Sequence, residues 1–243
     1  MLNLPSEFVI IGHMFDIWQI DLDWSFDWSL DKINRHYAVL SAEEQQRANR
    51  FLQEKHRRQY AISHIALRLI LAEYLNENAA DLRFTKGEFD KPALIPSQKN
   101  NVEFNLSHSY EKALIAVIRG QAVGVDLEFC KRQQDLLELA QRFFSRKECA
   151  QISQLGNRED QQQAFYRCWT RKEAFLKAIG RGISYGLDRF SVDLSKHPEQ
   201  NWLSTPDITD RYQLILPQHD LSDYEMAVVV QGEVTQWQYR KWP

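Results

Sequence analysis

Apolar and polar residues alternate along parts of the chain, and this alternation predicts its first elements. The stretch MFDIWQIDLD at residues 14–23 has a period of two, which predicts a half-buried strand. The sequence SAEE at residues 41–44 is a capping-box signal for the start of a helix. The helical pattern continues, with a break, to about residue 74, and residues 61–75 are apolar on most sides. We therefore expect a strand followed by a long, buried helix.

The rest of the chain shows turn signals between further periodic stretches. Residues 84–96 contain Gly87, Pro92 and Pro96, so we expect them to be extended or looped. Strands are predicted at residues 113–118, 121–129, 190–194, 212–216, 225–230 and 235–240, and helices from residue 145 and over 159–179, the second ending at Gly180.

This order of helix, strands, helices and strands predicts an α+β fold. Gly120 is the expected seam, which gives an N-terminal half at residues 1–119 and a C-terminal half at residues 120–243. Each half has a long helix followed by strands, so we expect two similar halves in a pseudo-twofold arrangement. The cleft between such halves is the expected active site.

Composition narrows the function classes. The 243 residues are 44% hydrophobic, enough for a packed core, and the net charge of −3 shows no basic excess of the kind that nucleic-acid binders carry. The three cysteines are widely spaced and form no CxxC pair, which predicts inert thiols in a reducing compartment. We find no signal-peptide pattern and no stretch that would span a membrane, so we expect a cytoplasmic protein without a membrane partner.

Two acidic residues lie close together in the sequence GVDLE at residues 124–128. On a strand, Asp126 and Glu128 point to one face, whereas Val125 and Leu127 point to the other. Like charges at this separation repel each other unless a cation lies between them, and Mg²⁺ prefers carboxylate oxygens. The alternative is a solvated strand face that carries its acids by chance.

A second charged pair lies in the sequence WTRKEAFLKA at residues 169–178. Glu173 and Lys177 are four residues apart and share one face of the predicted helix. They could form an ordinary exposed ion pair. Because the helix is otherwise largely apolar, the pair could instead face a cleft.

Five motifs follow one another along the chain: KP at 91–92, FNLSHS at 104–109, GVDLE at 124–128, FFSRKE at 143–148 and WTRKEAFLK at 169–177. In this order they resemble the Sfp-type 4'-phosphopantetheinyl transferases, and the resemblance extends from about Arg47 to Phe190. It implies that family's fold of two halves and a magnesium-dependent transfer of the phosphopantetheine arm of coenzyme A to a serine of an apo acyl or peptidyl carrier protein, with release of 3',5'-ADP. The implied acceptors serve fatty-acid, polyketide or nonribosomal-peptide biosynthesis.

The resemblance also implies roles for individual residues. Asp126, Glu128 and Glu173 would hold Mg²⁺ beside the diphosphate of coenzyme A. Lys177 would reach the same phosphates, and Glu173, Lys177 and Glu148 would form the catalytic set. The residues implied in coenzyme A binding are Arg47, Lys86, Lys91, Asn105, Ser107, His108, Asp126, Glu173 and Lys177.

Two positions have more than one interpretation. The family casts the residue at Glu148 as general base for the incoming serine, yet SRKE at residues 145–148 is also a capping box that would only complete a helix start. Some relatives have a second basic residue three positions before Arg47, where this chain has Glu44. Binding of the 3'-phosphate would then depend more on Arg47 and Lys91.

Two other function classes account for part of the sequence. Another magnesium-dependent phosphate enzyme, such as a nuclease or pyrophosphohydrolase, would also need clustered acids, but it would not explain the SHS and KP elements. A non-catalytic binder of carrier proteins or coenzyme A would not need the complete acidic set. We expect a monomer, because the two halves would supply both walls of the cleft, and we expect the carrier protein to dock near residues 142–158.

Overall fold

The structure is a computed structural model, and it divides into two compact units. The first unit comprises described residues within Met1–Lys86, Pro92–Gly120 and Gln236–Pro243, and the second those within Gly87–Lys91 and Gln121–Thr235. The predicted boundary between residues 119 and 120, and the predicted cleft, stay predictions. The described residues are 15–23, 33, 35–87, 89, 91–98, 100–131, 135–199 and 201–242.

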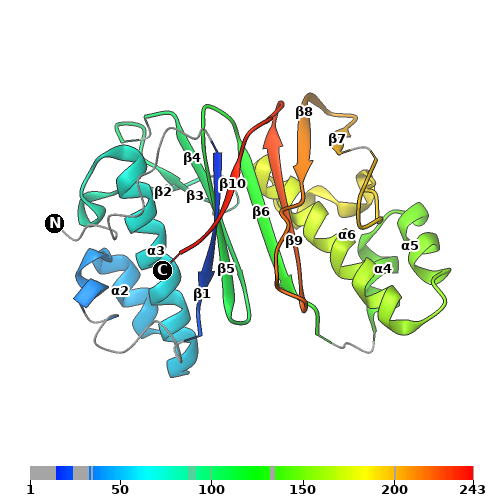
Figure 1. The fold of residues 1–243 in the computed structure, drawn as a ribbon, viewed down its shortest axis with the longest axis horizontal. Helices are drawn as coiled ribbons and strands as arrows, with labels where there is room; N and C mark the ends of the chain where they lie inside the picture. The colour runs from blue at the N-terminus through cyan, green and yellow to red at the C-terminus, as the bar shows by residue number, and fades with distance from the viewer. Residues whose placement is uncertain are drawn as a thin grey trace. The chain divides into compact units, whose positions relative to one another are not determined.

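The first unit is a four-stranded sheet with a long helix, α3, against one face (Figure 1). The strand order is β10-β1-β5-β4, in which β10 is parallel to β1 and the other neighbours are antiparallel. A separate two-stranded sheet pairs β2 with β3. The elements are β1 (Phe15–Asp21), η1 (Tyr37–Val39), α2 (Ala42–Asn49), α3 (Glu54–Leu75), η2 (Ala79–Asp81), β2 (Phe84–Lys86), β3 (Pro92–Leu94), β4 (Val102–Ser109), β5 (Lys112–Arg119) and β10 (Gln238–Lys241).

The strand predicted at residues 14–23 is confirmed as β1 within the described residues, but it is buried on both faces instead of half-buried. Its polar residue Asp16 is fully buried. The carboxylate of Asp16 accepts hydrogen bonds from Arg240 Nε at 2.9 Å and from the Tyr74 hydroxyl. A buried charge is tolerated when it is paired in this way, and the pairing fixes the C-terminal strand β10 beside β1.

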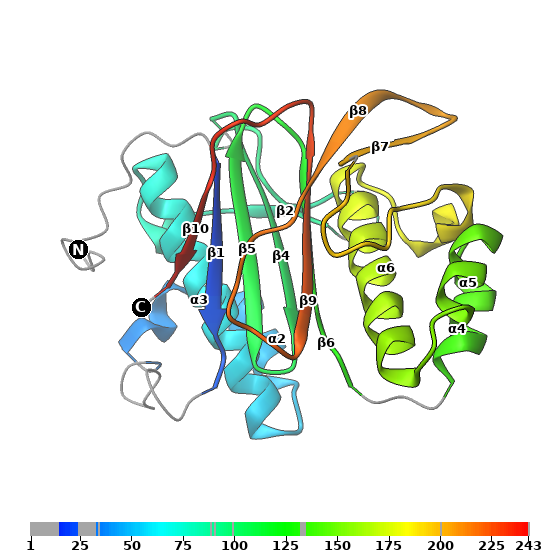
Figure 2. The ribbon, with the colours of Figure 1, turned by 45° about the vertical axis from the view of Figure 1, so that its right-hand side comes forward.

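The second unit is an antiparallel sheet of order β6-β9-β8-β7 with helix α6 against it (Figure 2). The shorter helices α4 and α5 pack on α6, and a cluster of buried apolar side chains fills the space between helices and sheet. The elements are β6 (Val123–Phe129), α4 (Leu136–Phe143), α5 (Arg146–Ser153), α6 (Arg158–Ala178), η4 (Ile183–Tyr185), η5 (Leu187–Arg189), β7 (Trp202–Thr205), β8 (Ile208–Ile215) and β9 (Tyr224–Gln231).

The structure confirms the α+β class and most of the predicted helix ends. Both capping boxes form, at Ser41 before α2 and at Ser145 before α5. Beyond α6, Gly180 adopts a left-handed conformation with φ of 66°, which glycine accommodates without strain. Within the described ranges, none of the helices has the length and apolar character needed to cross a membrane.

The strand predicted at residues 190–194 is wrong. This segment has no ladder partner among the described strands, because side chains take up its backbone groups instead. Val192 N donates to the Glu148 carboxylate at 2.8 Å. Three basic residues of α6 donate to its carbonyl oxygens: Lys172 to Phe190, Arg171 to Asp193 and Arg167 to Leu194.

Candidate active site

The strand β6 and the helix α6 approach each other most closely at Gly124. A methyl group built at this position would lie 2.1 Å from the carbonyl oxygen of Ala174 and 2.3 Å from the amide nitrogen of Ala178. Asp126 follows two residues later on the same face of the strand and therefore also faces α6. Gly124 thus allows α6 to approach β6 close to the acidic side chain of Asp126.

Asp126 is buried and ion-paired with the last turn of α6. The ammonium group of Lys177 donates to Asp126 Oδ1 at 2.6 Å and to the carbonyl oxygen of Val125 at 3.1 Å. The sequence placed Lys177 beside Glu173 on one helix face. The structure turns its ammonium group to Asp126, a contact between elements that helical spacing could not show.

Glu173 lies one helical turn before Lys177 and is half-buried. The pKa of Glu173 is raised to about 7, most of all by burial and also by the negative charges of Asp126 and Glu128, against the opposing effect of Lys177. One carboxylate oxygen, Glu173 Oε1, is buried and accepts no hydrogen bond from the described residues. We call Asp126, Glu173 and Lys177 the polar cluster.

The carboxylates near the polar cluster suit a hard divalent cation by their chemistry. They offer only oxygen donors, their mutual repulsion disfavours the charged form of Glu173, and one buried oxygen lacks a donor. Among the described residues, however, no three His, Cys, Asp or Glu side chains are gathered as a group that could hold a metal ion. The predicted ligands Asp126, Glu128 and Glu173 therefore fit Mg²⁺ in kind, while their present side-chain positions form no three-ligand group.

Glu148 is fully buried and has a structural role in this conformation. It completes the capping box by accepting from Ser145 N at 3.0 Å. It also forms an ion pair of 2.9 Å with Lys172, which is equally buried. The structure thus shows the capping role that the sequence allowed, and the general-base role stays a prediction.

In the first unit, two predicted coenzyme A residues line the same cavity. Arg47, in the last turn of α2, and Lys86, at the end of β2, border a hollow of about 450 Å³. Sequence reasoning missed Arg50 and Phe51, which line it too. Arg50 follows Arg47 by three residues, a spacing that places both on one side of a helix end and could have identified it. The acidic residue Glu43 also lines the cavity, but the three cations outnumber it, so the net positive charge suits an anion.

The SHS motif of β4 has its residues on opposite faces of the strand. Asn105 and Ser107 share one face and are buried, whereas His108 is exposed and shares the other face with Phe104, a core residue. The electrostatic effect of His108 extends to His64 of α3. The structure therefore does not bring these three predicted residues to one point.

His64 is a neighbour of this face that the predicted site did not include. Its ring stacks on Tyr60 at 3.9 Å between centroids, and its Nδ1 lies 3.0 Å from the carbonyl oxygen of Tyr60. The pKa of His64 is lowered to about 4, most of all by burial and also by the nearby His108 and Arg47, against the opposing effect of its hydrogen bond with the Tyr60 carbonyl. His64 is thus an uncharged imidazole near Arg47.

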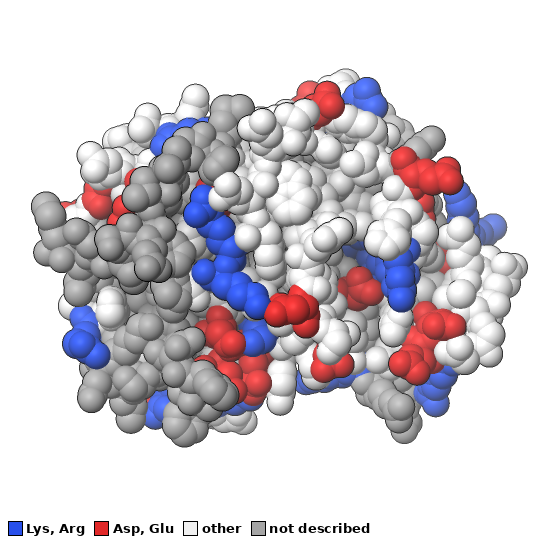
Figure 3. All heavy atoms as spheres, in the orientation of Figure 1, with Lys and Arg blue, Asp and Glu red and all other residues white. Residues whose placement is uncertain are grey.

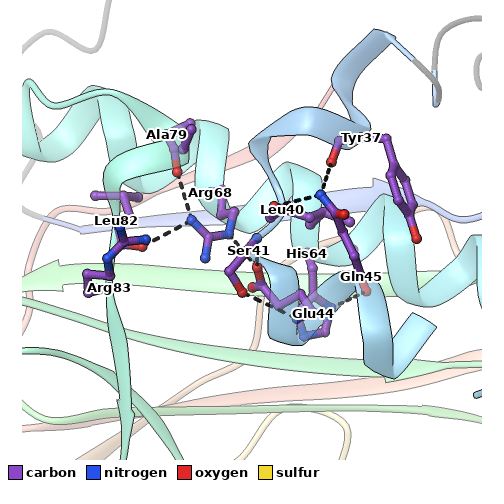
Figure 4. A network of polar contacts seen from close by, with 12 residues as sticks. Tyr37, Leu40, Ser41, Glu44, Gln45, His64, Arg68, Ala79, Leu82 and Arg83 are labelled. Atoms are coloured by element: carbon purple, nitrogen blue, oxygen red, sulfur yellow. Dashed lines mark hydrogen bonds and ion pairs between the residues drawn. The ribbon is translucent and has the colours of Figure 1, made fainter. Parts of the chain in front are cut away.

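Glu44, the acidic residue where some relatives have a base, is a central member of the network in Figure 4. Its carboxylate accepts from Ser41 N and from Arg68 Nε, both at 2.7 Å. Arg68 is buried and also donates to the carbonyl oxygens of Ala79 and Leu82. Glu44 therefore links the start of α2 to the middle of α3, and its charge is neutralised by Arg68.

Surface charge on one face of the molecule is mixed. In Figure 3, acidic and basic side chains are interspersed over a largely uncharged surface. Nucleic-acid-binding proteins instead gather Lys and Arg on one face. That nucleic acid is no partner stays a prediction.

Comparison with known proteins covers both units. A profile of the 4'-phosphopantetheinyl transferase superfamily matches residues 122–229. A profile of the N-terminal part of 4'-phosphopantetheinyl transferases matches residues 25–119. The first match includes β6 and α6, which carry the polar cluster.

Individual relatives match over most of their length. The 4'-phosphopantetheinyl transferase HetI of Nostoc sp. is 36% identical over 74% of this chain and 74% of HetI. The 4'-phosphopantetheinyl transferase Sfp of Bacillus subtilis is 31% identical over 68% of this chain and 71% of Sfp. The match to slr0495 of Synechocystis sp. is 37% identical and covers 65% of this chain and 64% of that protein. This chain belongs to the Sfp-type 4'-phosphopantetheinyl transferase family.

Proposed function

We propose that this enzyme transfers the 4'-phosphopantetheine arm of coenzyme A to a serine of an apo acyl or peptidyl carrier protein, releasing 3',5'-ADP. The observation that carries the proposal is the polar cluster, in which Lys177 and Asp126 are paired at 2.6 Å and Glu173 repels Asp126. Carboxylates and an ammonium group beside one another suit a diphosphate and its magnesium ion. The activity named for HetI and Sfp supports the same reaction here.

In the proposed step, the serine hydroxyl oxygen attacks the β-phosphorus of coenzyme A. A new P–O bond forms, and the P–O bond to 3',5'-ADP breaks with its electron pair on the departing oxygen. Lys177, oriented by Asp126 and the Val125 carbonyl, would stabilise the negative charge that develops there. Mg²⁺, when held by Asp126, Glu128 and Glu173, would neutralise phosphate charge.

We assign Glu148 a structural role in this mechanism. As a base it would have to give up its 2.9 Å ion pair with Lys172 and its bond from Val192 N, leaving buried polar groups unpaired. The serine proton would instead pass to a water molecule beside the diphosphate. In this proposal Glu148 takes no part in the proton transfer.

The first unit would bind the adenosine end of coenzyme A. Arg47, Lys86 and Arg50 line a cavity with the acidic Glu43, and the net positive charge of this lining would attract the 3'-phosphate. Glu44 adds no positive charge for the 3'-phosphate, because it is a carboxylate and is ion-paired with Arg68. His108, Ser107 and Asn105 stay proposed coenzyme A residues on β4.

The decisive experiment combines the purified protein with coenzyme A, Mg²⁺ and an apo carrier protein. We expect the carrier to gain the mass of one phosphopantetheine and an equal amount of 3',5'-ADP to appear, and we expect chelation of Mg²⁺ to stop both. Release of 3',5'-ADP without a carrier protein would indicate a hydrolase. Binding of both substrates without any mass gain would indicate a non-catalytic binder.

We further propose a cytoplasmic monomer that docks its carrier protein near residues 142–158. All three cysteines are free thiols, as is usual in a reducing compartment. Arg146 and Lys147 are exposed at the start of α5 and would attract an acidic carrier. Replacing both by Glu should raise the KM for the carrier and leave the KM for coenzyme A unchanged.

A further inference from the structure

The short segment Gly87–Lys91 is part of the second unit, although its neighbours along the chain belong to the first. It closes on itself through a hydrogen bond of 2.8 Å from Gly87 N to Lys91 O. Phe89 packs on Gly182, where an ideal methyl group would lie 3.0 Å from the Phe89 ring. Lys91 is half-buried and is the charged residue of this segment among those described.

The ammonium group of Lys91 binds two backbone carbonyl groups. It donates to Val123 O, at the start of β6, and to Lys177 O, in the last turn of α6, both at 2.8 Å. Carbonyl groups in the last turn of a helix have no partner within the helix, and a cation there is also favoured by the helix dipole. Lys91 therefore joins β6 to α6 by two charge-assisted hydrogen bonds.

This link lies at the closest approach of β6 and α6. Val123 directly precedes Gly124, whose backbone touches the end of α6. Three residues beyond Val123, Asp126 receives the side chain of Lys177. The backbone of Lys177 is thus held by Lys91, while its side chain holds Asp126.

We propose that Lys91 is a positioning residue, which holds the end of α6 against β6 and so sets the distance between Lys177 and Asp126. This differs from the role that the family resemblance implies, direct binding of the 3'-phosphate of coenzyme A. Moving the Lys91 ammonium group to a phosphate would remove its bonds to Val123 O and Lys177 O. The inference rests on the proposed function, because it is the geometry of the transfer site that Lys91 controls.

The two roles predict different results with coenzyme A and 3'-dephospho-coenzyme A. The dissociation constants of both compounds are measured by calorimetry, and kcat is measured with an apo carrier protein. For Lys91→Met we expect kcat to fall about tenfold or more while the affinity ratio of the two compounds stays at the wild-type value. For Arg47→Met, the matched control, we expect that ratio to fall about tenfold, because Arg47 would contact the phosphate itself.

Lys91→Arg keeps a cation with several N–H donors and should restore most of kcat, so it tests the same idea if Lys91→Met folds poorly. Loss of stability alone would not produce a kcat defect that the conservative variant rescues. A collapse of the affinity ratio in either Lys91 variant, or a wild-type kcat in Lys91→Met, would overturn the proposal. If the wild-type protein transfers nothing, the proposed function fails, whereas the affinity ratios still report on Lys91.

Discussion

The glycine of the GVDLE motif should be intolerant of even one methyl group. In Gly124→Ala the new carbon would lie 2.1 Å from Ala174 O, 2.3 Å from Ala178 N and 2.8 Å from the carbonyl carbon of Lys177. Carbon–oxygen contacts are normally about 3.3–3.6 Å. All three neighbours are backbone atoms, so α6 or β6 must move by about 1 Å.

This movement should weaken both folding and transfer. Overpacking of this kind costs about 1–3 kcal/mol of unfolding free energy, and sometimes more. A displacement of about 1 Å would stretch the 2.6 Å bond between Lys177 and Asp126 beyond normal hydrogen-bonding range. Since a misplacement of this size can lower a rate about 100-fold, we expect kcat to fall by that order.

Urea unfolding followed by circular dichroism measures the first effect, and carrier-protein modification at saturating coenzyme A measures the second. Gly156→Ala is the matched control, because a methyl group there meets nothing within 4 Å. We expect that control to stay within about 0.5 kcal/mol of wild type in urea unfolding. If Gly124→Ala matches Gly156→Ala in unfolding and the wild-type protein in kcat, the close contact of β6 and α6 is not as described.

Four further variants test other parts of the structure. Lys172→Met should lower the unfolding free energy in urea by about 3–5 kcal/mol, because it leaves Glu148 buried without its ion-pair partner. A folded Glu148→Gln variant should keep kcat within about tenfold of wild type. A loss of kcat of about 100-fold or more would instead support the general-base role of Glu148. Asp126→Asn should lower transfer at least about 100-fold, and near-normal activity at modest Mg²⁺ would refute the metal assignment. His64 has a folded-state pKa of about 4, below its unfolded value, so the unfolded state binds the extra proton and the unfolding free energy falls as the pH drops from about 6.5 to 4. His64→Phe should reduce this pH-dependent loss by about 1–3 kcal/mol. An unchanged pH profile of stability would contradict the burial of His64.

The sequence was sufficient wherever local chemistry decides the structure. Ser41 and Ser145 begin helices in the predicted way, since a capping box needs only residues three positions apart. The alternation in β6 likewise identified Asp126 as a residue that shares a face with Glu128. These features depend on the neighbours along the chain, which the sequence contains.

Prediction failed where a residue that is distant in the sequence binds a group in place of a local partner. Residues 190–194 have the apolar character of a strand, but Lys172 and Arg171 of α6 occupy their carbonyl groups. The partner of Lys177 is Asp126, 51 residues away, instead of the residue one turn before it on the helix. Lys91 likewise binds the backbone carbonyl groups of Val123 and Lys177, a contact that the KP motif does not indicate. Such contacts depend on which elements pack together, and this is not encoded in the spacing of residues.

The GVDLE motif therefore combines two physical tasks on one strand face. Gly124 has no side chain, so α6 can press against the strand at that point. Two residues on, Asp126 projects from the same face, and its carboxylate accepts a hydrogen bond from the Lys177 ammonium group of the helix. A larger residue at position 124 would hold the helix away and leave the Asp126 carboxylate without its cation. Gly124 is thus a requirement of the acidic site, because the close packing that it permits between β6 and α6 determines whether Lys177 reaches Asp126.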